Sequence, residues 1–405
     1  MQTQLADFIK DTPEGHEADQ ILRTCVHCGF CNATCPTYQL LGNELDGPRG
    51  RIYLVKQLLE GHEVSAKTQL HLDRCLTCRA CESTCPSGVT YHRLADIGRH
   101  LVEERVQRPL PERLLRWGLR QVLPYRARFT PLLRLGQALR PLLPAALKAK
   151  VPAAAAAGRW PAARHARRVL LLEGCVQPAL APDINAATAR VLDRLGVSVE
   201  RVAAAGCCGA VSYHLNAQEE GLDFMRRLID AWWPAIESGV EAIIVNISGC
   251  GVTVKEYGHL LHADPAYAEK AARVSAMTRD IGEFLAQEAG LQGRQVGRGR
   301  RLAFHSPCTL QHGQKLDGVV EGLLSGLGFQ LTPVHDAHLC CGSTGTYSIL
   351  QPELSLTLRD NKLKNLEAGD PELIATANIG CLTHLAGGTR RPVRHWIEVL
   401  DQALA

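Results

Sequence analysis

The 405-residue sequence has no long hydrophobic run. No stretch approaches the roughly 20 consecutive apolar residues that a membrane-spanning helix needs. The first residues, MQTQLADFIKDTPEG, carry acidic side chains where a secretory signal peptide would carry Lys or Arg. We therefore expect a cytoplasmic protein.

Charged residues are also scarce, at 21% of the chain, whereas 46% of the residues are hydrophobic. Such a chain can bury one or more full cores, which excludes a disordered tail or a disulfide-stapled miniprotein and predicts two or three domains. Cysteine, in contrast, is abundant, with 16 residues. Because a reducing cytosol disfavours disulfides, metal ligation is the first expectation for these thiols.

Two copies of the pattern C-x2-C-x2-C-x3-C-P begin 50 residues apart, as CVHCGFCNATCP from Cys25 and CLTCRACESTCP from Cys75. In two-cluster ferredoxins the first three cysteines hold one cluster and the fourth serves the other, so we predict two [4Fe–4S] clusters. The first set of ligands is Cys25, Cys28, Cys31 and Cys85, and the second is Cys35, Cys75, Cys78 and Cys81. Zinc is the alternative, but structural zinc usually takes two CxxC pairs separated by a longer gap.

The two loops differ in their predicted surroundings. Gly29 follows Cys28, whereas Arg79 stands at the matching position of the second copy. A positive charge beside a cluster favours its reduced form, so the two potentials are expected to differ. His27 is expected to be an exposed loop side chain rather than a ligand. Between the copies, DGPRG is followed by apolar residues at helical spacing, which predicts a helix that packs the loops together.

A basic segment follows the second copy. Residues 113–168 contain 13 Lys or Arg and no Asp or Glu, whereas the whole chain has a net charge of only +4. Leu and Ala are frequent there, and six prolines break the segment into short pieces. It is interpreted either as an amphipathic surface for anionic lipid headgroups or an acidic partner, or as a solvated connector. Nucleic acid is disfavoured because the interleaved aromatic residues of a single-strand binder are missing.

An internal repeat begins at about residue 167. In each copy a cysteine is followed after 31 residues by Cys-Cys-Gly, and a further cysteine follows the next predicted strand. The pattern predicts parallel α/β units whose cysteines lie beyond the carboxyl ends of the strands, where ligands bind. The candidate sites are Cys175, Cys207, Cys208 and Cys250 in the first half, and Cys308, Cys340, Cys341 and Cys381 in the second. A further cluster, zinc, a thiol pair and buried structural thiols remain open, and Gly209 and Gly342 are expected to permit tight turns.

Histidines distinguish the two halves. His214 is near the first set of cysteines, whereas five surround the second set: His305, His312, His335, His338 and His384. Because histidine titrates near neutral pH, we hypothesise proton-coupled chemistry such as quinone reduction in the second half, with His338 and His384 as candidates for proton transfer. The alternative is that these are surface or supporting histidines.

The chain resembles the iron–sulfur subunits of bacterial glycolate oxidase (glycolate dehydrogenase), within a superfamily of cysteine-rich CCG electron-transfer subunits. The residues that carry the resemblance are RTCVHCGFCNATCPTYQLLGNELDGPRGRIYLVKQLLEG, RCLTCRACESTCPSGV, the two CCG segments and FHSPCTLQHGQK. It implies that electrons pass from FAD-binding partner subunits, which oxidise glycolate to glyoxylate, to the membrane quinone pool. It also implies peripheral association with the cytoplasmic membrane. This sequence shows no GxGxxG after a predicted strand, so FAD is expected on the partner only.

Related subunits serve glycerol-3-phosphate dehydrogenase, lactate utilisation and heterodisulfide reduction, and these are the alternative functions. The heterodisulfide branch has a CxxC pair at the end of each CCG segment, but here Ile247 and Asn378 replace its first member. Four cysteines per half therefore remain instead of five. Contenders from other classes are a zinc-stabilised scaffold and a thiol–disulfide catalyst.

The predicted fold is α+β and multidomain, with a mainly helical two-cluster ferredoxin-like domain and a pseudo-twofold α/β cysteine-rich domain. The expected boundaries are residues 1–110 for the ferredoxin-type domain, 111–166 for the connector, 167–295 for the first CCG half and 296–405 for the second.

Overall fold

The computed structural model describes residues 1–144 and 151–405, so residues 145–150 of the predicted connector lie outside the described residues. Two compact units are present. Unit 1 comprises Met1–Trp117 and His338–Leu358, and unit 2 comprises Gly118–Ala337 and Arg359–Ala405. A segment predicted as part of the second CCG half thus clusters with the N-terminal part.

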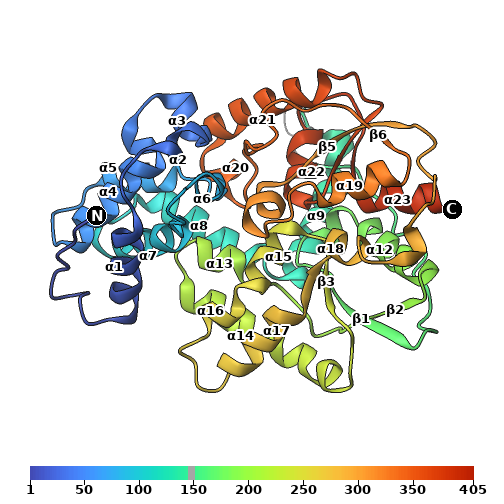
Figure 1. Ribbon diagram of the computed structural model, residues 1–405, viewed down its shortest axis with the longest axis horizontal. Helices are drawn as coiled ribbons and strands as arrows, with labels where there is room; N and C mark the ends of the chain where they lie inside the picture. Colours follow the sequence, from blue (N-terminus) through green and yellow to red (C-terminus); the bar gives the residue numbers. More distant parts are fainter. Residues whose placement is uncertain (145–150) are drawn as a thin grey trace. The chain divides into compact units, whose positions relative to one another are not determined.

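Unit 1 is helical (Figure 1). Its helices are α1 (Pro13–Thr24), α2 (Phe30–Ala33), α3 (Pro36–Leu41), η1 (Glu44–Asp46), α4 (Pro48–Leu59), α5 (Ala66–Asp73), α6 (Ala80–Ser83), α7 (Tyr91–Arg105) and α20 (Tyr347–Leu350). The helix predicted after DGPRG is confirmed as α4, with Pro48 in its first turn and Ile52, Val55 and Leu58 buried. It packs closely on α7, because a Cβ at Gly98 would lie 2.5 Å from Val55 Cγ2.

Unit 2 contains two four-stranded parallel sheets. The first has the order β2-β1-β3-β4 and the second the order β6-β5-β7-β8, which confirms the predicted internal repeat. Their strands are β1 (Arg167–Leu172), β2 (Val197–Glu200), β3 (Ile243–Val245), β4 (Thr278–Asp280), β5 (Arg301–His305), β6 (Gln330–Leu331), β7 (Leu373–Thr376) and β8 (Val393–His395). The apolar runs of β1, β3 and β7 are almost wholly buried, as expected for strands covered on both faces.

Helices connect these strands. They are α11 (Gln177–Leu180), α12 (Asp183–Arg194), α13 (Ala210–His214), α14 (Gln218–Glu237), α15 (Ser248–Lys255), α16 (Tyr257–Leu260), α17 (Ala268–Met277), α18 (Ile281–Leu285), η3 (Ala289–Leu291), η4 (Thr309–Gly313), α19 (Val319–Gly326), α22 (Ile379–Ala386) and α23 (Trp396–Leu404), while α21 (Pro352–Glu367) has residues in both units. Both halves contribute to one hydrophobic core, which includes the fully buried Trp232 and Trp396.

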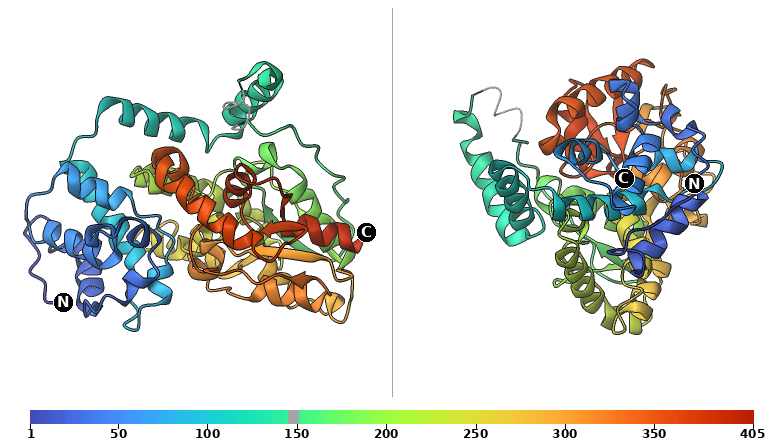
Figure 2. Two further views of the ribbon diagram at one scale, coloured as in Figure 1. Left: turned by 90° about the horizontal axis from the view of Figure 1, so that it is seen from above. Right: turned by 90° about the vertical axis from the view of Figure 1, so that its left-hand side faces the viewer.

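The basic segment forms α8 (Leu110–Val122), α9 (Arg126–Leu139) and η2 (Arg140–Leu142). No residue of α9 is buried, and α9, in teal, lies at the edge of the ribbon in both views of Figure 2. Within the described residues, no helix has both the length and the hydropathy needed to span a bilayer.

Candidate metal centres

The thiols of the first predicted cluster line one cavity. Cys25, Cys28 and Cys31 come from the loop before and within α2, and Cys85 follows α6. The loop turns through a left-handed residue, Gly29 (φ 86°), which caps α2. A Cβ there would lie 2.6 Å from Arg49 Nη1, so glycine leaves room for the guanidinium group beside the cavity.

The thiols of the second predicted cluster line a separate cavity. Cys75, Cys78 and Cys81 come from the second motif, and Cys35 comes from the first. Each motif therefore lends its fourth cysteine to the other cavity, and Cys81 of the second predicted set lines both cavities. Four converging thiols around an apolar cavity fit the donor set of an iron–sulfur cluster.

Buried positive charge distinguishes the second cavity. Arg51 is 1% exposed, and its Nη1 lies 3.9 Å from Cys35 Sγ. Arg99 donates to the Cys75 carbonyl at 2.5 Å. Although burial opposes ionisation, these two guanidinium groups lower the pKa of Cys75. In the first cavity, by contrast, burial and neighbouring thiols raise the pKa of Cys31 to about 11.

Sequence reasoning singled out Arg79, which does line the second cavity, but it missed Arg51 and Arg99. Arg79 caps α6 in a left-handed conformation (φ 63°), and its Nε donates to Glu82 at 3.2 Å. Its charge is therefore paired with a carboxylate. Arg51 directly follows DGPRG in the first turn of α4, but no spacing rule indicates that this arginine points into the cavity.

The first cavity is the more accessible of the two. Cys28 is exposed, and the apolar side chains of Val26 and Phe30 on the same loop are 68% and 62% exposed. His27 is half-buried, has a left-handed backbone (φ 60°) and lies at the cavity wall. A solvent-facing apolar rim around a thiol site is a surface that a partner protein would cover.

The four cysteines of the first CCG half converge. Cys207 interacts through its thiol with Cys175 and Cys208, and Cys208 interacts in turn with Cys250. Hydrogen bonds from the Cys207 and Cys250 thiols hold the pKa of Cys208 well below its usual range. Gly209 (φ 87°) turns the chain, and its N–H donates to Cys207 Sγ at 3.4 Å.

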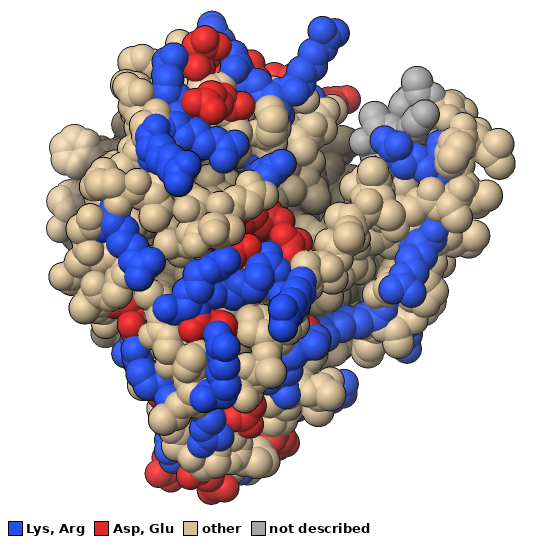
Figure 3. All heavy atoms as spheres, turned by 90° about the vertical axis from the view of Figure 1, so that its right-hand side faces the viewer, with Lys and Arg blue, Asp and Glu red and all other residues tan. Residues whose placement is uncertain are grey.

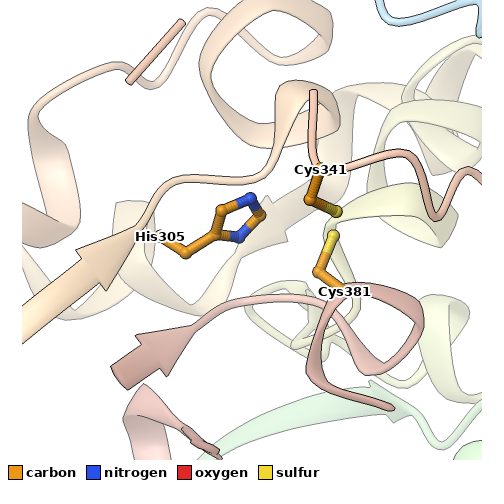
Figure 4. A group of neighbouring side chains, drawn as sticks. All are labelled: His305, Cys341 and Cys381. Carbon is orange, nitrogen blue, oxygen red and sulfur yellow. The ribbon is translucent and has the colours of Figure 1, made fainter. Parts of the chain in front are cut away.

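The second CCG half repeats this turn but has a different donor set. The Gly342 N–H (φ 88°) donates to Cys340 Sγ at 3.4 Å. The ligand atoms of His305, Cys341 and Cys381 all lie within 4.8 Å of one another. Figure 4 shows the imidazole, from the end of β5, pointing towards the two sulfurs. The His305 ring also bonds Thr376 Oγ1 through Nδ1, at 2.9 Å.

His305 has no equivalent in the first half. In the β5–β7 register His305 pairs with Thr376, whereas the matching pair of β1 and β3 is Leu172 and Val245. Burial and the positive Lys362 lower the pKa of His305 to about 3, so this imidazole is neutral at physiological pH. His338 and His384 are half-buried, His335 and His214 are exposed, and His312 is half-buried.

Family models match three segments of the chain. Residues 21–89 match a 4Fe–4S dicluster domain. Residues 169–255 and 302–386 match a cysteine-rich domain. The first segment contains both ferredoxin-type motifs, and the other two contain the two sets of CCG cysteines.

The chain is also similar to curated proteins over most of its length. It is 62% identical to the glycolate oxidase iron–sulfur subunit of Escherichia coli (strain K12), with 100% of this chain and 99% of the relative covered. It is 29% identical to the probable glycolate oxidase iron–sulfur subunit of Bacillus subtilis (strain 168), covering 91% and 89%. Lactate utilization protein A of Geobacillus kaustophilus is 28% identical over 243 residues, which is 58% of this chain and 98% of that protein.

Proposed function

Since the chain belongs to the family of glycolate oxidase iron–sulfur subunits, we propose that it is the electron-transfer subunit of a glycolate-oxidising complex. The observation that carries the proposal is 62% identity over the full chain, together with two cavities that are lined by the cysteines of both motifs. A partner flavoprotein with FAD would oxidise glycolate to glyoxylate, and a membrane quinone would be the final acceptor.

Two [4Fe–4S] clusters would occupy the two cavities of unit 1. Cys25, Cys28, Cys31 and Cys85 would hold the first, and Cys35, Cys75, Cys78 and Cys81 would hold the second. When bound, such clusters accept and release single electrons. The buried guanidinium groups of Arg51 and Arg99 would stabilise added negative charge in the second cavity. Its potential should therefore be the higher, and electrons should enter at the first.

The flavoprotein would dock at the first cavity. The exposed Cys28 thiol and the apolar Val26 and Phe30 support this site, because a partner that covers them brings its cofactor close to the first cluster and excludes water. The four thiols of each CCG half would form the further metal sites. The donor sets would then be Cys175, Cys207, Cys208 and Cys250 in the first half, and Cys308, Cys340, Cys341 and Cys381 in the second.

The basic segment would rest on the membrane surface. On α9 and η2, Leu132, Leu135, Leu139 and Leu142 recur at helical spacing and are 44% to 81% exposed. Residues 113–168 carry no acidic side chain, and the surface beside the grey atoms in Figure 3 shows blue and tan atoms but no red ones. An apolar face among arginines is suited to anionic lipid headgroups.

Lactate is the second candidate for the donor. The lactate utilization proteins support it, but they match only 58% of this chain, whereas the glycolate oxidase subunit of E. coli matches all of it. The partner flavoprotein would decide between the two donors.

The test is to isolate the complex anaerobically from cells through a tag on this chain. We expect about eight irons and eight acid-labile sulfides per chain in the ferredoxin-type sites, paramagnetic resonance after dithionite, and a co-purifying flavoprotein that reduces a quinone analogue with glycolate. A colourless chain that holds zinc alone would refute the proposal. A co-purifying flavoprotein specific for lactate would show that lactate, not glycolate, is the electron donor.

A further inference from the structure

The segment His338–Leu358 belongs to the same compact unit as the ferredoxin-type domain, although it lies about 230 residues further along the chain than α7. It contains Cys340 and Cys341 of the second CCG half, together with α20 and the start of α21. This one segment of the second cysteine-rich half is thus part of the unit that holds the two cluster cavities, whereas the rest of that half belongs to unit 2.

Tyr347 makes a contact between this segment and the backbone beside the second cavity. Its hydroxyl donates to the backbone carbonyl of Arg74 at 3.1 Å. Arg74 directly precedes Cys75, which lines that cavity. The tyrosine is 7% exposed. Because a buried hydroxyl is costly to leave without its acceptor, this hydrogen bond holds the backbone around Tyr347 next to Arg74.

The same phenol lies among charges from both sides. Burial raises its pKa, and the Tyr347 hydroxyl interacts electrostatically with Arg51 and Cys75 of the second cavity and with Cys340 of the CCG turn. One side chain is therefore within electrostatic range of a thiol of the ferredoxin-type domain and of a thiol of the second CCG half.

The turn that carries Cys340 is rigid. Ser355 Oγ donates to the Gly342 carbonyl at 2.8 Å, and a Cβ at Gly342 would lie only 2.5 Å from the Ser355 carbonyl oxygen. The Gly342 N–H in turn donates to the Cys340 sulfur. Any displacement of Tyr347 would be transmitted through this turn to Cys340, since the backbone between them is short and packed.

The first CCG half is arranged differently. Its cysteines all belong to unit 2, and its buried tyrosine, Tyr257, donates to the Cys208 carbonyl of its own half at 2.8 Å. The two halves share a fold but place their tyrosine hydroxyls on different acceptors.

We propose that Tyr347 is a positioning residue that fastens the CCG turn around Cys340 beside the second ferredoxin-type cavity, so that this turn is electrostatically coupled to that cavity. The inference rests on the proposed function, since the coupling is measured on bound clusters. Tyr347 would also keep water from the backbone beside Cys75, and the Cys340 thiol acts electrostatically on the same phenol.

Two matched pairs of variants test the inference in the full-length protein with its clusters bound. Tyr347→Phe removes the hydroxyl bond to the Arg74 carbonyl beside Cys75, and Tyr257→Phe removes the matching hydroxyl bond to the Cys208 carbonyl of the first CCG turn. Cys340→Ser and Cys207→Ser change equivalent cysteines of the two turns. The readouts are the midpoint potential and paramagnetic resonance spectrum of each cluster, and the hydrogen exchange of residues 338–358.

We expect Tyr347→Phe and Cys340→Ser to shift the midpoint potential of the second cluster and to leave that of the first unchanged, as an internal reference. Tyr257→Phe and Cys207→Ser should shift neither midpoint potential. Tyr347→Ala should raise the midpoint potential of the second cluster, because water entering the cavity stabilises the more negative reduced cluster, and should speed exchange in residues 338–358. Equal spectra in all variants, or larger shifts from Cys207→Ser, would overturn the inference. A wild-type protein without cluster signals would instead refute the proposed function.

Discussion

At the scale of single residues, buried arginine is the feature that separates the two cluster cavities. Arg51 is fixed by a bond from its Nε to the His71 carbonyl at 2.7 Å and by Asp46, whose Oδ1 lies 3.7 Å from its Nη2. Asp46 is itself fully buried and also accepts from Arg74 at 3.0 Å. The guanidinium group is therefore held in place before any cluster is bound.

Replacing Arg51 with Met should make the midpoint potential of the second cluster more negative, because the reduced cluster loses a nearby positive charge. The free energy of unfolding should fall by about 3 kcal/mol, because Asp46 loses one of its cations. Redox titration followed by paramagnetic resonance measures the first effect, and thermal unfolding measures the second. Arg49→Met, at the exposed first cavity, is the control and should leave the second midpoint unchanged.

A second prediction at this scale concerns His395, which caps α23 by accepting a bond from the Ile397 N–H on Nδ1. Burial lowers its pKa to about 4. In the unfolded chain histidine titrates near pH 6.5, so between these values the unfolded state binds more protons. The free energy of unfolding should therefore fall as the pH drops from 6.5 towards 4, with about 3 kcal/mol attributable to this residue.

His395→Asn keeps a side chain that can cap the helix but removes the titration. We expect the unfolding free energy of this variant to depend less steeply on pH over the same range. Part of the slope should persist, because the buried His305 also has a lowered pKa. Denaturant unfolding at a series of pH values measures the slope, and an unaltered slope would contradict the assignment.

At the scale of elements, α9 stands out because it is amphipathic without packing against a core. Its first residues do have partners: Arg126 Nε donates to the Gly174 carbonyl at 2.8 Å, and Tyr125 packs edge-on against Phe224 beside Cys175 and Cys207. The start of α9 is thus anchored beside the first CCG site, while the leucines further along α9 remain exposed.

The double variant Leu135→Glu/Leu139→Glu should bind vesicles of phosphatidylglycerol at least about tenfold more weakly than the wild type. It loses apolar burial in the bilayer interface and adds charge of the same sign as the lipid. A flotation or sedimentation assay measures the binding. Leu356→Glu, at an equally exposed leucine of α21, is the matched control. Undiminished binding by the double variant would remove α9 from the membrane contact.

At the scale of the whole molecule, the two cysteine-rich halves are joined within unit 2. Asp401 of α23 accepts from Arg190 at 2.6 Å and from Arg194 at 2.5 Å, and both arginines lie on α12 of the first half. Ser248 of the first half meets Thr309 Oγ1 of the second at 2.8 Å. Their shared core makes the repeat one folding unit.

Asp401→Asn should lower the free energy of unfolding by about 2 kcal/mol, because two partly buried arginines lose their carboxylate. Asp370→Asn is the control, since Asp370 is 79% exposed in its pair with Arg391 and should change stability by less than about 0.5 kcal/mol. Chemical denaturation of both variants gives the comparison. A two-step transition in Asp401→Asn would show that the halves unfold separately.

The sequence by itself determined the elements whose signal is local. Thiol spacing predicted both sets of cluster ligands, which stay a prediction, and the members of each set line one cavity, with Cys81 lining both. The repeated cysteine pattern predicted parallel α/β units, but β4 and β8 carry no such signal because TRD and VRH are short and polar. The positive φ of Gly209 and Gly342 follows from the CCG turn itself.

Only the tertiary structure decided which charged and polar side chains meet. Arg51 and Arg99 reach the second cavity from α4 and α7, His305 turns towards Cys341 and Cys381, and Tyr347 bonds Arg74 across more than two hundred residues of sequence. Such contacts depend on how helices and strands pack in three dimensions, and a long side chain can point in several directions from the same position. Periodicity records which face of an element is buried, but it does not record what lies opposite that face.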